Sequence, residues 1–219
     1  VLFFILGYVL FHGIGALNWD FFTKLPTPVG ETGGGMANAI VGSIQVVGLA
    51  AIFGLPIGIL GGTYLSEYGQ GGKLAFAVRY AADVINGMPS IVMGIFAYTL
   101  IVMPMRHFSA LAGSVALGIM LIPICLRSTE EFLNLVPVGI RESALALGLP
   151  QWKVILFVVF PTAFSGLMTG SLLSISRISG ETAPLLFTAF GNRYWGQGLL
   201  NPIATLPVMI FTYAVAPYD

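Results

Sequence analysis

The sequence has 219 residues, of which 57% are hydrophobic and only 8% are charged. Average soluble domains carry about 25% charged residues, so this composition excludes an ordinary water-soluble globule and predicts a membrane protein. Nine Lys and Arg residues balance nine Asp and Glu residues. The chain therefore lacks the basic field that nucleic-acid binding requires.

Uncharged stretches predict the first two membrane spans. Residues 1–17 form an apolar run that predicts a membrane helix, and a polar loop follows over residues 18–35. The 35 residues between Glu31 and Glu67 carry no charge, and about 20 apolar residues suffice to cross a bilayer core. Within this second span, glycine recurs every fourth residue, which predicts close packing against another helix: Gly54, Gly58 and Gly62.

The third span is predicted over about residues 74–103 and is interrupted at Pro89. Such a proline either bends the helix so that it lines a translocation path, or only kinks a packing helix. Both alternatives stay open at this point. Arg79 and Asp83 are four residues apart, so they are expected to share one face of the helix.

Two further spans are predicted over about residues 108–126 and 154–178, with a polar loop over 127–153 between them. The last unbroken apolar run, 203–216, has only 14 residues, which is short for a span. It predicts an interfacial segment, with three aromatic residues at headgroup level: Trp195, Tyr213 and Tyr218. The sequence thus predicts an all-α polytopic membrane protein with about five transmembrane helices.

Residues 141–161 combine a water-facing segment with the entrance of a membrane helix. Helix propensity is high over residues 142–147, and Gly148 then offers the permissive backbone that a helix end needs. Pro150 is well placed to start a new helix, which becomes entirely apolar after its first turn. This pattern predicts a docking surface that is joined directly to the bilayer.

The same stretch resembles the signature loop of ABC-importer permeases, in which E-A-A precedes G and I-x-L-P at fixed spacings. The matching residues are Glu142, Ser143, Ala144, Gly148, Val158, Phe160 and Pro161. Three of them depart mildly from the motif: Ser143, Val158 and Phe160. The resemblance implies a coupling helix that sits in a cleft of a cytoplasmic ATPase. The ATPase-coupling residues would be Arg141, Glu142, Ser143, Ala144 and Gly148. On the residues alone, an ordinary helical loop is the alternative.

The basic residues weakly support an orientation. If the loops after spans two and four are cytoplasmic, five basic residues lie on that side: Lys73, Arg79, Arg127, Arg141 and Lys153. The other four lie elsewhere: Lys24, Arg106, Arg177 and Arg193. This bias follows the positive-inside rule. Together with the signature loop, it predicts a cytoplasmic N-terminus.

Arg177 and Glu181 stand at the end of the fifth span, four residues apart, so they are neighbours if the helix persists that far. Ionised groups at such a place are costly unless they meet a partner or a water-filled path. The planar guanidinium suits phosphate oxygens, and Glu181 could hold it when no anion is present. The alternative is a structural salt bridge at the membrane boundary.

The run from Arg177 to Asn192, and a later one from Leu206 to Asp219, resemble the permease subunits of bacterial phosphate ABC importers. The resemblance implies a MetI-like fold and a phosphate path touched by Arg177 and Glu181. It also implies partners: a second homologous permease, a cytoplasmic ATP-binding dimer, an extracytoplasmic phosphate-binding protein and membrane lipid. Family members continue into a sixth membrane helix. We therefore expect residues 1–219 to be a single permease domain, cut from a longer bacterial inner-membrane protein.

Transport by alternating access is the function that this resemblance implies. No cofactor is expected, because ATP would be bound by a partner and the chain has no G-x-x-x-x-G-K-[ST] motif. An integral-membrane enzyme is disfavoured, since the two histidines, His12 and His107, lie far apart without an H-E-x-x-H motif. A permease for another oxyanion, such as sulfate or molybdate, is the nearer alternative. A channel or scaffold is disfavoured by the coupling loop.

Overall fold

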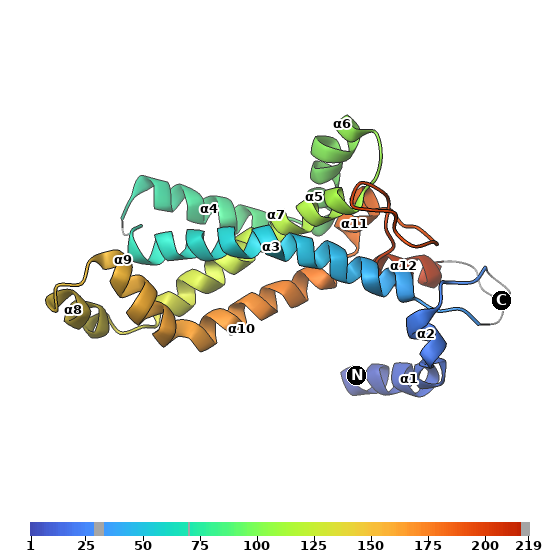
Figure 1. The fold of residues 1–219 in the computed structure, drawn as a ribbon, viewed down its shortest axis with the longest axis horizontal. Coiled ribbons are helices and arrows are strands. Elements are labelled where there is room, and N and C mark those ends of the chain that lie inside the picture. Colours follow the sequence, from blue (N-terminus) through green and yellow to red (C-terminus); the bar gives the residue numbers. More distant parts are fainter. Residues whose placement is uncertain (29–32, 70, 216–219) are drawn as a thin grey trace.

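The computed structural model describes residues 1–28, 33–69 and 71–215, and all regular secondary structure in them is helical (Figure 1). The predicted all-α class is confirmed. The α-helices are α1 (Leu2–Gly13), α2 (Trp19–Thr23), α3 (Ala37–Glu67), α4 (Lys73–Gly87), α5 (Ser90–Ala97), α6 (Met103–Met105), α7 (Ala110–Asn134), α8 (Val138–Ala146), α9 (Gln151–Val154), α10 (Phe160–Ser179), α11 (Ala183–Thr188) and α12 (Leu206–Val215). A 3-10 turn (Ile14–Ala16) extends α1. π-helical turns join α5 to α6 (Tyr98–Val102) and α9 to α10 (Ile155–Val159).

Three helical stretches of the described chain are long and apolar enough to cross a membrane: α3, α7 and the continuous stretch Gln151–Ser179. A fourth span results if α4 and α5, which are bent by 105° at a short break, count as one. The protein is therefore polytopic, as its composition predicts. The first predicted span is shorter than expected, because α1 has 12 residues; α12 has only 10.

Helices α3 and α7 form the centre of the fold, and glycine lets them approach closely. A Cβ atom added at Gly54 would lie 2.8 Å from the side chain of Leu121, and one at Gly58 would lie 2.7 Å from the Cβ of Cys125. At Gly62 the added atom would lie 2.5 Å from a backbone oxygen of α7. These distances are too short for real side chains. The predicted small-residue face is confirmed.

The interruption of the third predicted span is sharper than a kink. Met88 and Pro89 are both extended, with ψ of 140° and 136°. Proline disfavours the helical conformation of the preceding residue and supplies no N–H, which explains the break. Helix α4 lies along α7, whereas α5 turns away and packs against α11 (Figure 1). A Cβ added at Gly94 would lie 3.0 Å from Pro184, so this contact is also close.

Helix α7 continues beyond the predicted end of the fourth span. The sequence predicts a loop from Arg127 onward, whereas α7 runs to Asn134. The charged residues do not end the helix because they pair with α4: Arg127 binds Asp83 and Glu130 binds Arg79. The predicted start of the loop at residue 127 is therefore wrong, and α7 ends at Asn134. The ion pairs with α4 cannot be read from the spacing of charges along α7 alone.

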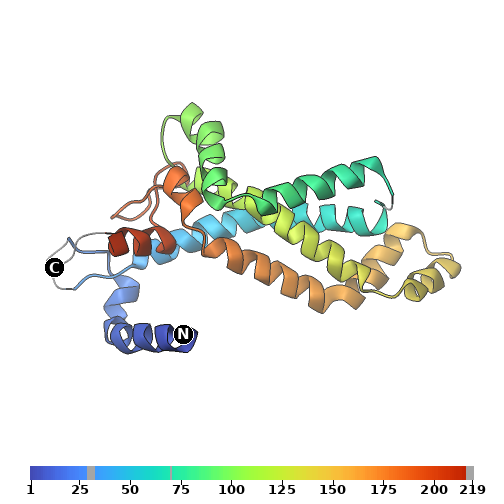
Figure 2. The same cartoon turned by 180° about the vertical axis from the view of Figure 1, so that it is seen from behind.

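The two ends of the molecule carry different elements. Helices α8 and α9 project at one end, beside the C-terminal end of α3 and the start of α4 (Figures 1 and 2). Helices α2, α5, α6, α11 and α12 gather at the opposite end. Helix α1 stands apart from the bundle, and none of its described side chains is buried. Of the predicted interfacial aromatics, Trp195 is exposed and Tyr213 lies on α12, while Tyr218 falls outside the described residues.

Candidate coupling surface and anion site

Helix α8 presents a short polar surface at one end of the molecule. Pro137 precedes it in an extended conformation, and Gly148 follows its end at a φ of +80°, where a side chain would be strained. Glu142 and Ser143 are exposed on this helix, whereas Ala144 is buried in an apolar cluster shared with α7 and α10. The helix, turn and helix predicted for this stretch are therefore present, with two polar side chains turned outward.

Arg141 points inward from α8 and contacts the ends of two other helices. Its guanidinium donates to the Glu67 carboxylate at the end of α3, with N–O distances of 2.7, 3.1 and 3.2 Å. It also donates to the backbone oxygens of Leu133, at 2.7 Å, and of Val136. Arg141 and Glu67 side chains are only 17% and 6% exposed. Arg141 therefore joins α8 to α3 and α7 rather than contributing to the outer surface of α8.

The last two residues of α3 make further contacts around this ion pair. Ser66 Oγ donates to Asn134 Oδ1 of α7 at 2.8 Å, and Gln151 Nε2 of α9 donates to the backbone oxygen of Glu67 at 3.0 Å. A cavity of about 410 Å³, partly lined by Glu142, lies between these groups. The end of α3 is thus bonded to α7, α8 and α9 together.

A second ion network joins α4 to α7 near the same end. Arg79 donates to Glu130 at 2.6 Å, and Arg127 donates to Glu130 at 2.8 Å and to Asp83 at 2.7 Å. The Glu130 side chain is only 7% exposed and binds both arginines. Arg79 and Asp83 share a helix face as predicted, yet each pairs with a residue of α7. The four charges therefore fasten α4 to α7.

Arg177 and Glu181 are four residues apart in the sequence, but their side chains do not form an ion pair. Helix α10 ends at Ser179, so Glu181 leaves the helical register in which the two residues would be neighbours. Among the described residues, neither side chain has a hydrogen bond or an ion pair. Arg177 is exposed and Glu181 is half-buried. The salt bridge considered as the structural alternative is not formed here, which leaves the guanidinium free for another anion.

The exposed face of α10 leads toward Arg177 with several hydroxyl groups. Ser165, Thr169 and Ser176 are all exposed at helical spacing along this otherwise apolar helix. Thr169 donates to the backbone oxygen of Ser165 at 2.8 Å, which satisfies its hydroxyl within the helix. These hydroxyl groups place polar positions among the exposed apolar side chains of α10.

The chain is similar to known transport proteins over most of its length. Residues 54–217 match the family of binding-protein-dependent transport system inner membrane components. The chain is 49% identical over 207 residues to the phosphate transport system permease protein PstA of Xylella fastidiosa strain 9a5c, covering 94% of the chain and 72% of that protein. It is 47% identical over 214 residues to PstA of Haemophilus influenzae, covering 98% and 76%. The chain belongs to the PstA family of ABC-transporter permeases.

The fold of this PstA-family chain matches a solved structure of the MetNI methionine ABC transporter in an inward-facing conformation. The TM-score is 0.64, and the match covers 84% of this chain and 83% of that one at 19% identity. At this identity the likeness establishes the MetI-like fold alone.

Family membership determines what class of protein this PstA-family chain is. It is an inner-membrane, multi-pass permease component of an ABC transporter and not an ATPase, and such permeases hold no cofactor. As a component of a binding-protein-dependent system, it works with an ATPase and a binding protein. The enzyme and scaffold alternatives are thereby excluded.

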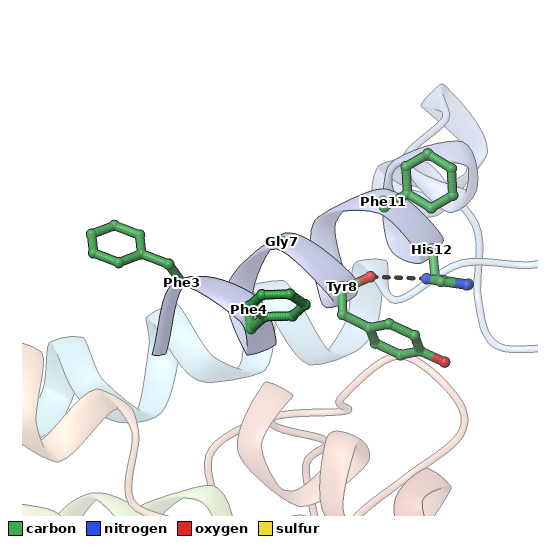
Figure 3. A pocket seen from close by; sticks show the side chains of 6 residues that line it. All are labelled: Phe3, Phe4, Gly7, Tyr8, Phe11 and His12. Carbon is green, nitrogen blue, oxygen red and sulfur yellow. Dashed lines mark hydrogen bonds between the residues drawn. The ribbon is translucent and has the colours of Figure 1, made fainter. Parts of the chain in front are cut away.

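A groove of about 420 Å³ along α1 has a different character. It is lined only by residues of this one helix: Phe3, Phe4, Gly7, Tyr8, Phe11 and His12 (Figure 3). The Nδ1 atom of His12 lies 3.0 Å from the backbone oxygen of Tyr8, and the two rings are 4.1 Å apart. Because one helix cannot enclose a ligand, this is an aromatic surface of α1 and not a binding site.

Sequence reasoning missed Glu67 and did not foresee the pairing of Arg127 with Asp83. Each of these residues sits at the end of an uncharged run, where opposite charges follow on a neighbouring predicted span. Charges at the same end of adjacent spans have few partners other than each other. Matching opposite charges across neighbouring spans would therefore have suggested the contact of Arg127 with Asp83, but not that of Glu67 with Arg141, because Arg141 lies in the predicted loop.

Proposed function

We propose that this chain forms half of the path for inorganic phosphate in an ATP-driven importer. The observation that carries the proposal is Arg177, an exposed arginine with no protein partner in the described chain, at the end of a long apolar helix. A guanidinium left unpaired in such a place is costly unless an anion or water reaches it. Its fork of donors fits two phosphate oxygens at once. The curated relatives are permeases of phosphate transport systems, which supports this choice of anion.

Glu181 fits the path as the second polar group near Arg177. A carboxylate repels a fully ionised phosphate, but it accepts a hydrogen bond from a protonated oxygen of the monohydrogen or dihydrogen anion. This repulsion keeps the affinity modest, which a transporter needs because a tightly held anion would not be released. The hydroxyl groups of Ser165, Thr169 and Ser176 extend the polar surface along α10.

We further propose that α8 is the coupling helix and faces the cytoplasm. Its outward residues, Glu142 and Ser143, would contact the ATPase, Ala144 would seat the helix on the bundle, and Gly148 would close it. The N-terminus would lie on the cytoplasmic side too, since it is at the end of α1 that points toward α8, and α1 runs from there toward the opposite end of the molecule (Figure 1).

A second homologous permease would complete the path. One chain with three or four spans has too few helices to enclose a water-filled passage. In the apolar windows of α3 and of the stretch Gln151–Ser179, only 22% and 28% of the residues are buried within this chain. Part of their remaining surface would meet the second permease and the rest would face lipid. The two permeases would then rock as bodies between outward-open and inward-open arrangements.

The test of the anion path is phosphate uptake by the complete importer carrying Arg177→Gln. We expect uptake to fall by about 10-fold to 100-fold, because one charge-assisted hydrogen-bonding group is lost. Arg177→Lys keeps the charge but not the fork, and should retain more activity. Arg106→Gln is the matched control: it removes the same charge from an exposed loop position. Undiminished uptake with Arg177→Gln would reject the proposed role of Arg177 in the anion path. Preferential sulfate uptake by the unaltered importer would favour a permease for another oxyanion.

A further inference from the structure

The end of α3 collects polar contacts that docking of α8 on an ATPase does not require. Five of them involve Ser66 and Glu67 with residues of α7, α8 and α9. An outward surface such as that of Glu142 and Ser143 could bind a partner without them. These contacts lie between the α8–α9 segment and the membrane helices α3 and α7.

We propose that the Glu67–Arg141 pair is the joint that transmits movement of α8 to the membrane helices α3 and α7. This inference rests on the proposed function of α8 as the coupling helix, and it assigns Arg141 and Glu67 as positioning residues. Neither residue would need to touch the ATPase or the transported anion.

The geometry of Arg141 supports a rigid connection. All three guanidinium nitrogens are engaged, by the two carboxylate oxygens of Glu67 and the backbone oxygens of Leu133 and Val136. Two of these acceptors lie near the end of α7: Leu133 is in its last turn, and Val136 is two residues beyond it. One side chain therefore holds α8 against the carboxylate of α3 and against the backbone at the end of α7, and a planar fork loses little freedom in doing so.

Burial makes it costly to separate the Glu67–Arg141 ion pair. Glu67 is 6% exposed and Arg141 is 17% exposed, so separating them would leave a nearly buried carboxylate without its cation. That cost is much larger than for a pair in water. A push on α8 is therefore more easily relieved by moving α3 and the end of α7 along with it than by opening the joint.

Gln151 provides a second connection to the same point. Its side-chain amide donates to the backbone oxygen of Glu67 at 3.0 Å, from the first residue of α9. The α8–α9 segment is thus tied to α3 on both sides of the turn at Gly148. Because α9 continues without interruption into α10 as far as Ser179, the joint also links α3 to the helix that carries Arg177.

The experiment measures phosphate uptake and ATP hydrolysis together, in vesicles containing the complete importer with its binding protein. Glu67→Gln should leave the ATPase bound, while the phosphate carried per ATP hydrolysed falls about tenfold. The control is Glu131→Gln, which makes the same change at an exposed α7 residue whose side chain has no partner in the described chain. A residue that only supports folding would lower assembly, uptake and hydrolysis together and leave their ratio unchanged.

Two further variants keep the test decisive. Arg141→Lys retains a cation for Glu67 but cannot also reach the backbone oxygens of both Leu133 and Val136, so the ratio should fall by a smaller factor, about threefold. The double variant Glu67→Arg with Arg141→Glu should recover part of the loss. An unchanged ratio in Arg141→Lys overturns the proposal even if Glu67→Gln fails to assemble.

Failure of the joint and failure of the coupling function give different results. Glu142→Arg changes an exposed side chain of α8 that is not bonded to the Glu67–Arg141 pair, and it should release the ATPase. If the ATPase stays bound and uptake is normal in Glu142→Arg, the docking role of α8 is rejected. If Glu142→Arg releases the ATPase but Glu67→Gln keeps a normal ratio, docking stands and the joint is rejected.

Discussion

The arginines near α8 and the arginine at the end of α10 have the same chemistry and opposite surroundings. Arg79, Arg127 and Arg141 each bind a carboxylate of another helix, and the two carboxylates that they enclose are almost fully buried. Arg177 has no such partner within the described chain. Within one membrane protein, the cations that hold helices together are neutralised internally, while Arg177, for which we propose an anion-binding role, is left open.

Glu130, which binds both Arg79 and Arg127, gives the strongest test of this comparison. Glu130→Gln removes a buried charge and leaves Arg79 and Arg127 facing each other across a neutral amide. We expect the folded state to lose about 3–5 kcal/mol, as when one partner of a buried ion network is removed. The measurement is thermal unfolding of the purified permease in detergent. Glu131→Gln, one residue away and exposed, is the control and should unfold near the normal temperature. Equal unfolding temperatures of the two variants would mean that the ion network around Glu130 does not stabilise the fold.

Asp83 tests the same network at its outer edge. Its side chain is 53% exposed, and it binds Arg127 at 2.7 Å. Solvent screens this contact, and Arg127 keeps Glu130 as a second partner, so Asp83→Asn should cost only about 0–1 kcal/mol. Thermal unfolding under the same conditions measures it. A loss of stability as large as that of Glu130→Gln would show that solvent exposure does not determine how much each charge contributes to stability.

Arg177 should show the smallest effect on stability. Because its guanidinium has no bond to lose within the described chain, Arg177→Gln should change the unfolding free energy by no more than about 0.5 kcal/mol. The same variant is expected to lose most phosphate uptake, so stability and transport separate at this residue. A large drop in unfolding temperature would instead make Arg177 a structural residue, with a partner supplied by another subunit.

Local patterns predicted much of this fold because their causes are local. The glycines spaced by four make a flat helix face wherever the helix forms, and Gly54, Gly58 and Gly62 do lie against α7. The stop at Gly148 and the restart after Pro150 follow from backbone preferences of those two residues. The matches to the signature loop and to the Arg177 region likewise led to the correct family. In each case the relevant partners lie within a few residues of one another.

Predictions that depended on distant partners were less complete. The break at Pro89 becomes a 105° turn because α5 finds a packing site on α11, which lies about ninety positions further along the chain. Helix α7 extends beyond its predicted end because residues of α4 pair with its charged side chains. Arg177 and Glu181 separate because the helix stops at Ser179, although their spacing alone would make them neighbours.

By itself, the sequence determined the membrane class, the helical content and the place of the helix, turn and helix over residues 138–154, because composition, apolar length and turn residues act on the chain locally. Only the tertiary structure decided which charges are neutralised. Arg141 could face outward or inward on α8, and it faces inward because Glu67 and the backbone oxygens of Leu133 and Val136 are there. A charge in or near a membrane is stable only against a specific partner, and the fold alone brings that partner within reach.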